Sequence, residues 1–343
     1  MTPSSAFSLR SRVSSLLLAL FLAFGALGFI PPPPVHASAF DSGAFYVNTY
    51  SDDPNATSCS SNAASNNCSL RGAISKANNT SGAVTIYLQS GSYPLFGEPG
   101  DDANQGGDLD ITKSGASISI IGDSISSTTI DGRGNDRIFD VQDTGAPTRL
   151  NLKNLSLANG NAGPFNDGGS IRTYGSLSLD TVSIHNSSGR LGGAIYIRSS
   201  YDQALIINRS AISFSSASLD GGAIYATGEV TTISNSTFDH NKATGLMGLY
   251  FSNSNAGRGG AIYNASSLSV SASTFAYNSA KVDGGAILNY AFMGINASTH
   301  INSSTFKSNS TAVANVATAN GNASTSAVTT LSNSILALSL IHI

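Results

Sequence analysis

Apolar residues recur in the second part of the chain as pairs whose members are five positions apart, with mostly small polar residues between them. These pairs are Leu152/Leu157, Leu179/Ile184, Ile207/Ile212, Ile233/Phe238, Val270/Phe275, Ile301/Phe306 and Leu331/Leu336. In a flat strand, residues five apart point to opposite faces, so both can be buried together only if the chain bends between them. The pattern predicts short strands joined by corners, with both apolar residues facing one interior.

A second motif, Gly-Gly followed by Ala-Ile or Ser-Ile, recurs between these pairs. It begins at Gly168, Gly192, Gly221, Gly259 and Gly284. Glycine fits a tight corner, where a side chain would collide or φ must be positive. We therefore assign a structural role to the glycine pairs and expect the isoleucines after them to stack in an inner ladder. The glycines are Gly192, Gly193, Gly221, Gly222, Gly259, Gly260, Gly284 and Gly285, and the isoleucines are Ile195, Ile224, Ile262 and Ile287.

Repeats of this length that contain short strands are typical of a solenoid of parallel strands. A helical solenoid is excluded because no repeat has a 3.6-residue period and the composition disfavours helix. A β-propeller is the rival architecture, but its blades need about 40 residues and four antiparallel strands. The sequence therefore predicts an all-β solenoid over residues 111–343.

Residues 40–110 have a different pattern. Apolar residues at positions 70, 73, 74 and 77 have helical spacing, and Ser69 precedes them as an N-cap. Alternating runs at residues 84–88 and 118–120 predict the first strands. Because a solenoid must cover the open apolar end of its first turn, we expect the short helix to cap it.

The first 39 residues have the pattern of a secretory signal peptide. Arg10 and Arg12 precede an apolar run, four prolines and Ala37-Ser38-Ala39, after which cleavage is expected. The apolar run approaches the length of a membrane span, so an uncleaved anchor is the alternative. No later segment is apolar enough to span a membrane. We expect the mature chain to be secreted or displayed at the cell surface.

Composition and cysteine content exclude some classes of partner and metal site. Charged residues make up 11% of the chain and the formal charge is −3, which provides no basic surface for nucleic acid. The only cysteines are Cys59 and Cys68. In an exported chain they predict one disulfide, since two thiols without a nearby histidine do not complete a metal site.

Two stretches of the sequence resemble known families. Cys68-Ser69-Leu70-Arg71-Gly72-Ala73-Ile74 resembles the CSLREA-type N-terminal module of bacterial exported proteins, although Gly72 stands where that family usually has Glu or Ala. The Gly-Gly-Ala-Ile and Phe-x-x-Asn repeats are similar to those of chlamydial polymorphic outer membrane proteins. The resemblance implies a right-handed, pectin-lyase-like parallel β-helix on an exported, often surface-attached, protein. The asparagines of the Phe-x-x-Asn repeats are Asn241, Asn278 and Asn309.

These asparagines have a structural interpretation. Asn tolerates positive φ at a corner and can hydrogen-bond the backbone of the next turn, forming a ladder. His185 and His240 lie beside Asn186 and Asn241 and are expected to be exposed.

A pectin-lyase-like fold raises the question of polysaccharide cleavage. A hydrolase needs converging carboxylates, and a lyase needs a cation site with a base. The acidic stretches lack the motifs of the polygalacturonase relatives, so we predict no catalytic residue and no cofactor. Residues 101–110 are expected to form a solvated acidic loop, with Ca²⁺ binding as the weaker alternative. For residues 131–137, ion pairing or capping is expected.

Two segments interrupt the regular repeats, residues 242–258 and 289–299. They contain Tyr250, Phe251, Tyr290 and Phe292, which could stack on sugar rings or dock a partner. The alternative is that each segment folds back over its own turn. We predict a structural, adhesive or glycan-binding surface protein, with a glycan or a surface protein as partner. The alternative function is a polysaccharide lyase or hydrolase.

The C-terminal end of the sequence differs from a capped solenoid. The last repeat runs from Leu331 to Leu336, and no capping helix or polar terminal turn follows it. Because an open end would expose strand edges and apolar side chains, we expect the natural chain to continue further.

Overall fold

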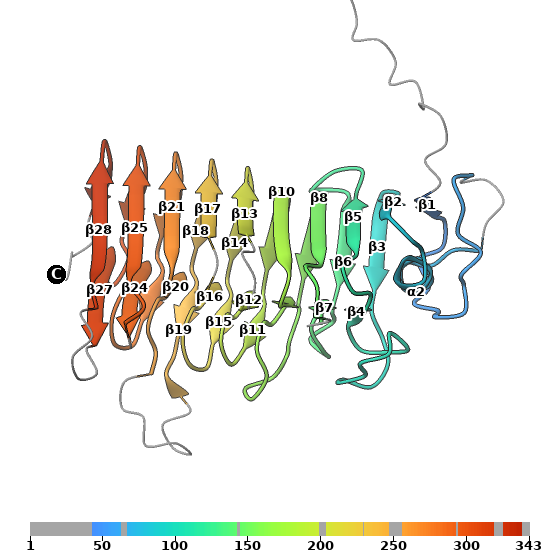
Figure 1. Cartoon of the computed structure of the whole chain (residues 1–343), viewed down its shortest axis with the longest axis horizontal. Helices are drawn as coiled ribbons and strands as arrows, with labels where there is room; N and C mark the ends of the chain where they lie inside the picture. Colours follow the sequence, from blue (N-terminus) through green and yellow to red (C-terminus); the bar gives the residue numbers. More distant parts are fainter. Residues whose placement is uncertain are drawn as a thin grey trace, which may run out of the picture. The chain divides into compact units, whose positions relative to one another are not determined.

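The computed structural model describes residues 43–62, 67–142, 145–198, 204–228, 230–246, 256–292, 294–318 and 325–337. The expected signal peptide, Tyr250 and Phe251 lie outside these residues. From Gly43 onward the chain is a parallel β-solenoid of about eight turns, with each strand beside its counterpart in the next turn (Figure 1). Within the described residues, no helical segment has the length and apolar character of a transmembrane helix.

Three parallel sheets run along the solenoid. The first sheet has 17 strands, because most turns contribute two successive strands to it. They are β1 (Ala44–Val47), β2 (Ala83–Leu88), β3 (Gly91–Pro94), β5 (Ser117–Ile121), β6 (Thr128–Asp131), β8 (Arg149–Ala158), β10 (Ser176–His185), β13 (Ala204–Asn208), β14 (Ala211–Ser213), β17 (Val230–Ser234), β18 (Thr237–Asp239), β21 (Ser267–Ser271), β22 (Thr274–Ala276), β25 (Ala297–Asn302), β26 (Thr305–Lys307), β28 (Ala327–Ser332) and β29 (Ile335–Ala337).

The two other sheets are narrower. The second consists of four short strands, and the third has eight. The short strands are β11 (Ser188–Gly189), β15 (Ser216–Ala217), β19 (Lys242–Ala243) and β23 (Ser279–Ala280). The third sheet contains β4 (Leu109–Ile111), β7 (Phe139–Val141), β9 (Ile171–Thr173), β12 (Ile195–Arg198), β16 (Ile224–Thr227), β20 (Ile262–Asn264), β24 (Ile287–Phe292) and β27 (Val313–Thr318).

The bend predicted within each apolar pair is confirmed. In all seven pairs, the residue two positions after the first member has positive φ, as at Thr181 (φ 59°) between Leu179 and Ile184. In six of the pairs both side chains are at most 1% exposed, whereas Leu331 and Leu336 are partly buried against the same core. The left-handed residue turns the chain so that both apolar side chains point inward.

The glycine pairs provide both features expected of a tight corner. The first glycine has positive φ, for example 64° at Gly192 and 70° at Gly221. The second lies so close to the next turn that a Cβ on Gly222 would be 2.0 Å from the carbonyl oxygen of Gly260. The isoleucines that follow are in register and fully buried, so the predicted inner ladder is confirmed. Their pairs are Ile195–Ile224, Ile224–Ile262 and Ile262–Ile287.

The Phe-x-x-Asn asparagines are buried and form a ladder, but they do not have positive φ. The left-handed residue lies one position earlier, as at His240 (φ 54°) and Tyr277 (φ 52°), so that expectation is wrong. The bend leaves the asparagine itself pointing inward, where its side chain reaches the neighbouring turn. The backbone N–H of Asn241 donates to Oδ1 of Asn278, and that of Asn278 donates to Oδ1 of Asn309.

The N-terminal cap forms as predicted. Helix α2 (Leu70–Asn78) follows Ser69, whose hydroxyl accepts the backbone N–H of Gly72, and its apolar face joins the solenoid core. The Cys59–Cys68 disulfide is present. A Cβ on Gly72 would lie 2.1 Å from the carbonyl oxygen of Ala56, which explains why this chain has glycine there. Strand β1, which precedes the helix, had no clear signal in the sequence.

Candidate functional site

A ladder of tyrosines lies on the outer face of the third sheet. The register of β12, β16 and β20 places Tyr196, Tyr225 and Tyr263 side by side, with ring centroids 5.7 and 4.5 Å apart. Tyr174 packs edge-on against Tyr196 at 6.3 Å, and Tyr290 lies 5.6 Å from Tyr263. Because each inward Ile is followed by an outward residue, the Ile ladder in the core aligns the tyrosines outside it.

Tyr290 and Phe292 extend this ladder at its C-terminal end. Strand β24 continues to Phe292, and a tight turn with an antiparallel bridge between Phe292 and Ile295 leads into β25. The segment is therefore largely strand and not a protruding loop. With Leu288 and Ala314 the two rings contribute to a small apolar cluster outside the main core. Both side chains cover their own turn, and Phe292 also lines a groove.

That groove, which we call the Tyr–Arg groove, has a volume of about 440 Å³. It lies beside the tyrosine ladder and combines ring faces, aliphatic side chains and two arginines. The described residues that line it are Arg190, Leu191, Tyr196, Arg198, Tyr225, Thr227, Gly228, Ala265, Ser266, Phe292 and Ile295. No Asp or Glu is among these lining residues.

Two of the nearby arginines are held in place. Arg190 makes a bidentate pair with Asp167, with both N···O distances 2.8 Å, and these hydrogen bonds raise the pKa of the guanidinium. The guanidinium of Arg258 lies over the ring of Tyr290, 5.4 Å from its centroid. The Nε of Arg258 is buried and has no hydrogen-bond partner among the described residues. Fixed guanidinium groups beside aromatic rings can pair with ligand oxygens.

The hydroxyl groups of the ladder are neutral at physiological pH, because a phenol titrates near about pH 10. Burial raises the pKa of Tyr196, Tyr225 and Tyr263 further, and the neighbouring Asp and Tyr side chains act in the same direction. A neutral phenol can donate one hydrogen bond and also accept. Because the rings stack on one another and Tyr196 and Tyr263 are each 6% exposed, the ladder presents ring edges and hydroxyl groups rather than open ring faces.

The sequence pointed to Tyr290 and Phe292 but not to the remaining tyrosines. The available signal was the Tyr that directly follows Gly-Gly-Ala-Ile in three repeats, at Tyr196, Tyr225 and Tyr263. An outward Tyr at the same place in successive turns must form a ladder. The structure does not bring the Phe-x-x-Asn asparagines to this groove, because they point into the solenoid.

A second group of charged residues lies between the cap and the first turns. Asp108 and Asp110 are fully buried, so the expectation of a solvated acidic loop is wrong for them. The reason is that Asp110 belongs to β4 and lies in register with Asp140 of β7, beneath the preceding loop. Arg172, the next residue in this row, pairs with Asp140 through two hydrogen bonds.

Buried arginines complete this group. Arg71 of α2 is fully buried, pairs with Asp52 at 2.7 and 2.9 Å, and donates to the carbonyl groups of Gly106, Gly107 and Asp108. Arg137 donates to Asp108 at 2.9 Å. These contacts tie the capping helix to the loop at residues 104–108, and they agree with ion pairing around residues 131–137.

Three carboxylates of this group could hold a cation. Asp102, Asp110 and Asp140 each have an oxygen within 4.8 Å of the others, and carboxylate oxygens are suitable ligands for Ca²⁺. Asp110 also accepts the backbone N–H of Asn104 at 2.8 Å and the amide of Gln142 at 3.3 Å. Burial, with Asp140 alongside, raises the pKa of Asp110 to about 7.

Part of the solenoid matches a known repeat. Residues 235–265 and 272–290 match the Chlamydia polymorphic membrane protein (Chlamydia_PMP) repeat, and these residues include Tyr263 and Tyr290. No curated protein matches the chain. Among solved structures, the chain is similar to ORF18 of Geobacillus virus E2, with 12% identity and a TM-score of 0.37. That match covers 96% of this chain but 64% of the viral protein. The solenoid thus contains repeats like those of the chlamydial membrane proteins.

Proposed function

We propose that this chain is a bacterial cell-surface protein whose β-solenoid binds an extracellular glycan through the Tyr–Arg groove. Three features support the location: the predicted signal peptide, the CSLREA-like stretch at residues 68–78, and the match to a membrane-protein repeat. Solenoids commonly present extended binding surfaces, because equivalent residues of successive turns lie in rows.

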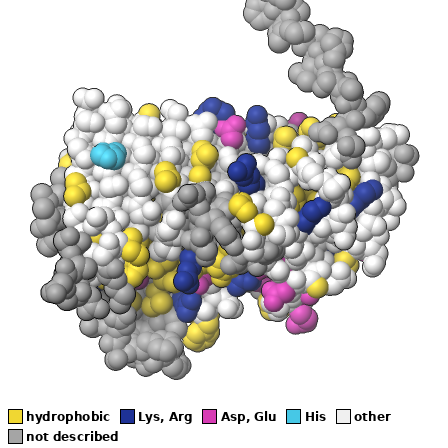
Figure 2. Space-filling view, in the orientation of Figure 1, with side chains coloured by type: hydrophobic (Ala, Val, Ile, Leu, Met, Phe, Trp, Pro, Cys, Tyr) yellow, Lys and Arg dark blue, Asp and Glu magenta, His cyan; other side chains and the backbone are white. Residues whose placement is uncertain are grey.

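The tyrosine ladder is the observation that carries the proposal. On the first sheet the outward residues are mostly Ser, Thr and Asn, and the face drawn in Figure 2 is mainly white, with separate charged and hydrophobic groups. The third sheet instead has a continuous row of rings bordered by Arg190, Arg198 and Arg258. Aromatic side chains form apolar walls of sugar-binding sites, while phenol and guanidinium groups hydrogen-bond sugar oxygens.

The groove does not favour the polysaccharide lyase or hydrolase alternative. Glycoside hydrolysis needs a pair of carboxyl groups at the scissile bond, and a lyase needs a cation site with a base. The described lining residues include no carboxylate or histidine. The clustered carboxylates Asp110 and Asp140 lie on other strands and already accept hydrogen bonds from Gln142 and Arg172. We therefore propose binding without cleavage.

The test is a screen of the full chain against immobilised bacterial and host polysaccharides, followed by affinity measurements on any glycan that binds. We expect Tyr225→Ala to weaken binding by about tenfold or more, because a central aromatic contact is lost. Tyr277→Ala is the matched control, since Tyr277 is an exposed ring on the first sheet side of the solenoid. Absence of binding to every glycan, or equal losses in the two variants, would refute the proposal.

A further inference from the structure

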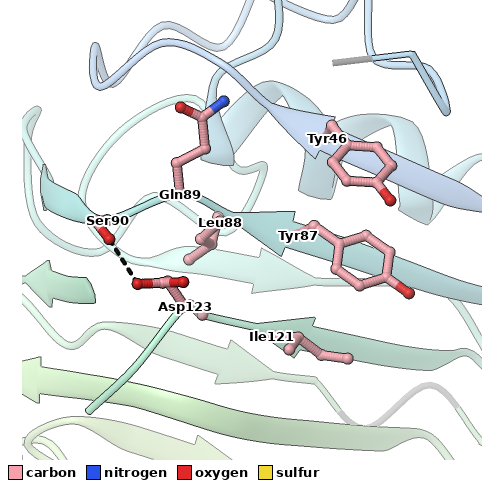
Figure 3. A pocket seen from close by; sticks show the side chains of 8 residues that line it. Tyr46, Tyr87, Leu88, Gln89, Ser90, Ile121 and Asp123 are labelled. Atoms are coloured by element: carbon pink, nitrogen blue, oxygen red, sulfur yellow. Dashed lines mark hydrogen bonds between the residues drawn. The ribbon is translucent and has the colours of Figure 1, made fainter. Parts of the chain in front are cut away.

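A second hollow lies on the first sheet near the N-terminal cap. It has a volume of about 590 Å³ and is separate from the Tyr–Arg groove. We call it the N-terminal hollow. Figure 3 shows two sides of it: Tyr46, Tyr87 and Ile121 follow one another across three strands, and Gln89, Ser90 and Asp123 lie opposite.

The aromatic side is a short ring stack that ends in the hollow. Tyr46 of β1 and Tyr87 of β2 are in register, with their centroids 4.8 Å apart and their planes at 16°. The residue in register on the next strand, β5, is Ile121. Ile121 continues the row with an aliphatic side chain, so that Tyr46, Tyr87 and Ile121 together form one apolar wall of the hollow. Gly122 follows Ile121 and adds backbone without a side chain to the floor.

The polar side holds an oriented carboxylate. The hydroxyls of Ser90 and Ser127 both donate to Oδ2 of Asp123, at 2.7 and 3.0 Å. These two bonds lower the pKa of Asp123, so the group is ionised at neutral pH. Both bonds go to the same oxygen, and among the described residues Oδ1 accepts no side-chain hydrogen bond. Oδ1 is therefore available to accept hydrogen bonds from a ligand.

We propose that the N-terminal hollow binds a neutral pyranose, with the sugar's C–H face against the apolar wall of Tyr46, Tyr87 and Ile121 and its hydroxyl groups donating to Asp123. Gln89 is exposed at the rim and carries an amide that can donate and accept. A flat apolar wall beside a few oriented polar groups is the usual design of a small-molecule site.

The charge of the hollow excludes acidic sugars. Among the described residues that line the hollow, Asp123 is the only charged one, and none is Lys, Arg or His. A uronate would bring a second negative charge beside it with no compensating cation. Quaternary ammonium ligands are recognised by rings on several sides. Here Tyr46 and Tyr87 stack on each other on one side of the hollow, so they cannot surround a cation, and a neutral pyranose fits better.

The experiment uses saturation-transfer NMR on the full chain with methyl glucopyranoside, methyl galactopyranoside and N-acetylglucosamine as neutral probes. Glucuronate is the acidic probe and choline the cationic one. We expect binding of at least one neutral probe, and neither glucuronate nor choline should bind. Asp123→Asn and Tyr87→Ala should each weaken that binding about tenfold, because a charge-assisted hydrogen bond or the ring contact is lost.

Two controls separate loss of binding from loss of structure. Tyr87→Phe keeps the ring and should bind as well as the original chain, and Tyr277→Ala removes an exposed ring elsewhere and should change nothing. The measurement is repeated in the Tyr225→Ala background, in which the Tyr–Arg groove is disabled, and Tyr87→Ala should weaken binding of the neutral probes there as well. The proposal is overturned if no neutral probe binds, if choline or glucuronate binds better, if Tyr277→Ala weakens binding as much as Tyr87→Ala, or if Tyr87→Ala has no effect in the Tyr225→Ala background.

Discussion

Replacing Asn278 by alanine probes the buried asparagine ladder at its centre. The side-chain amide of Asn278 donates to the carbonyl oxygen of Phe238 and to Oδ1 of Asn309, both at 2.9 Å. Its Oδ1 accepts the backbone N–H and the amide of Asn241, both at 3.0 Å. All of these atoms belong to residues that are at most 4% exposed.

The magnitude follows from the groups left without a partner in Asn278→Ala. The amide of Asn241 still donates to Ile212, and Oδ1 of Asn309 still accepts the backbone N–H of Asn278. The N–H of Asn241 and the carbonyl of Phe238 lose this partner. Each buried unsatisfied polar group costs about 1–3 kcal/mol, so we expect a loss of about 2–6 kcal/mol.

Urea unfolding followed by circular dichroism measures this loss. Asn55→Ala is the control, because Asn55 is exposed and close to the cap, and surface substitutions change stability by less than about 0.5 kcal/mol. If Asn278→Ala lost no more free energy of unfolding than Asn55→Ala, the ladder would not contribute to stability and the reasoning would be wrong.

Two further predictions concern the cap and the first turns. Because the pKa of Asp110 is raised to about 7 by burial, the folded protein holds a proton there that the unfolded chain releases near about pH 4. This contribution to the free energy of unfolding is complete below about pH 4 and is lost as the pH rises to 7. Between these pH values, the free energy of unfolding measured with urea should therefore decrease less in Asp110→Asn than in the parent protein. The same pH dependence in both proteins would contradict the prediction. The double variant Cys59→Ser/Cys68→Ser should lose about 3 kcal/mol, because the disulfide closes a short loop in the unfolded chain. Two reactive thiols in the unreduced parent protein would show that the bridge does not form.

Much of the fold is encoded locally. The separation of five within each apolar pair requires a bend, and the structure has a left-handed residue in every one of the seven pairs. The glycine pairs, the capping helix with its N-cap Ser69, and the disulfide are equally local, since each depends on a few neighbouring residues. The repeat itself therefore determines a parallel solenoid with a capped N-terminal end.

Which outward residues lie in one row depends on the register between strands of successive turns. That register is set by the packing of the whole turn. Successive turns differ in length, so the alignment of Tyr196, Tyr225 and Tyr263 follows only once the isoleucines beside them stack. The same holds for Asp110, Asp140 and Arg172, which are far apart in the sequence but adjacent on β4, β7 and β9. Tyr46, Tyr87 and Asp123 likewise meet only in the folded chain.

The sequence alone also did not indicate which charged side chains are buried. Asp108 and Asp110 lie in a polar, glycine-rich stretch that has the composition of a solvated loop. They are buried because Arg71 of the capping helix donates to three carbonyl groups of that stretch and Arg137 pairs with Asp108. Local sequence determined the strands, the corners and the cap. Long-range contacts decided which outward side chains lie together and which charged side chains are buried. The reason is that these two features depend on residues that come close only when the chain folds.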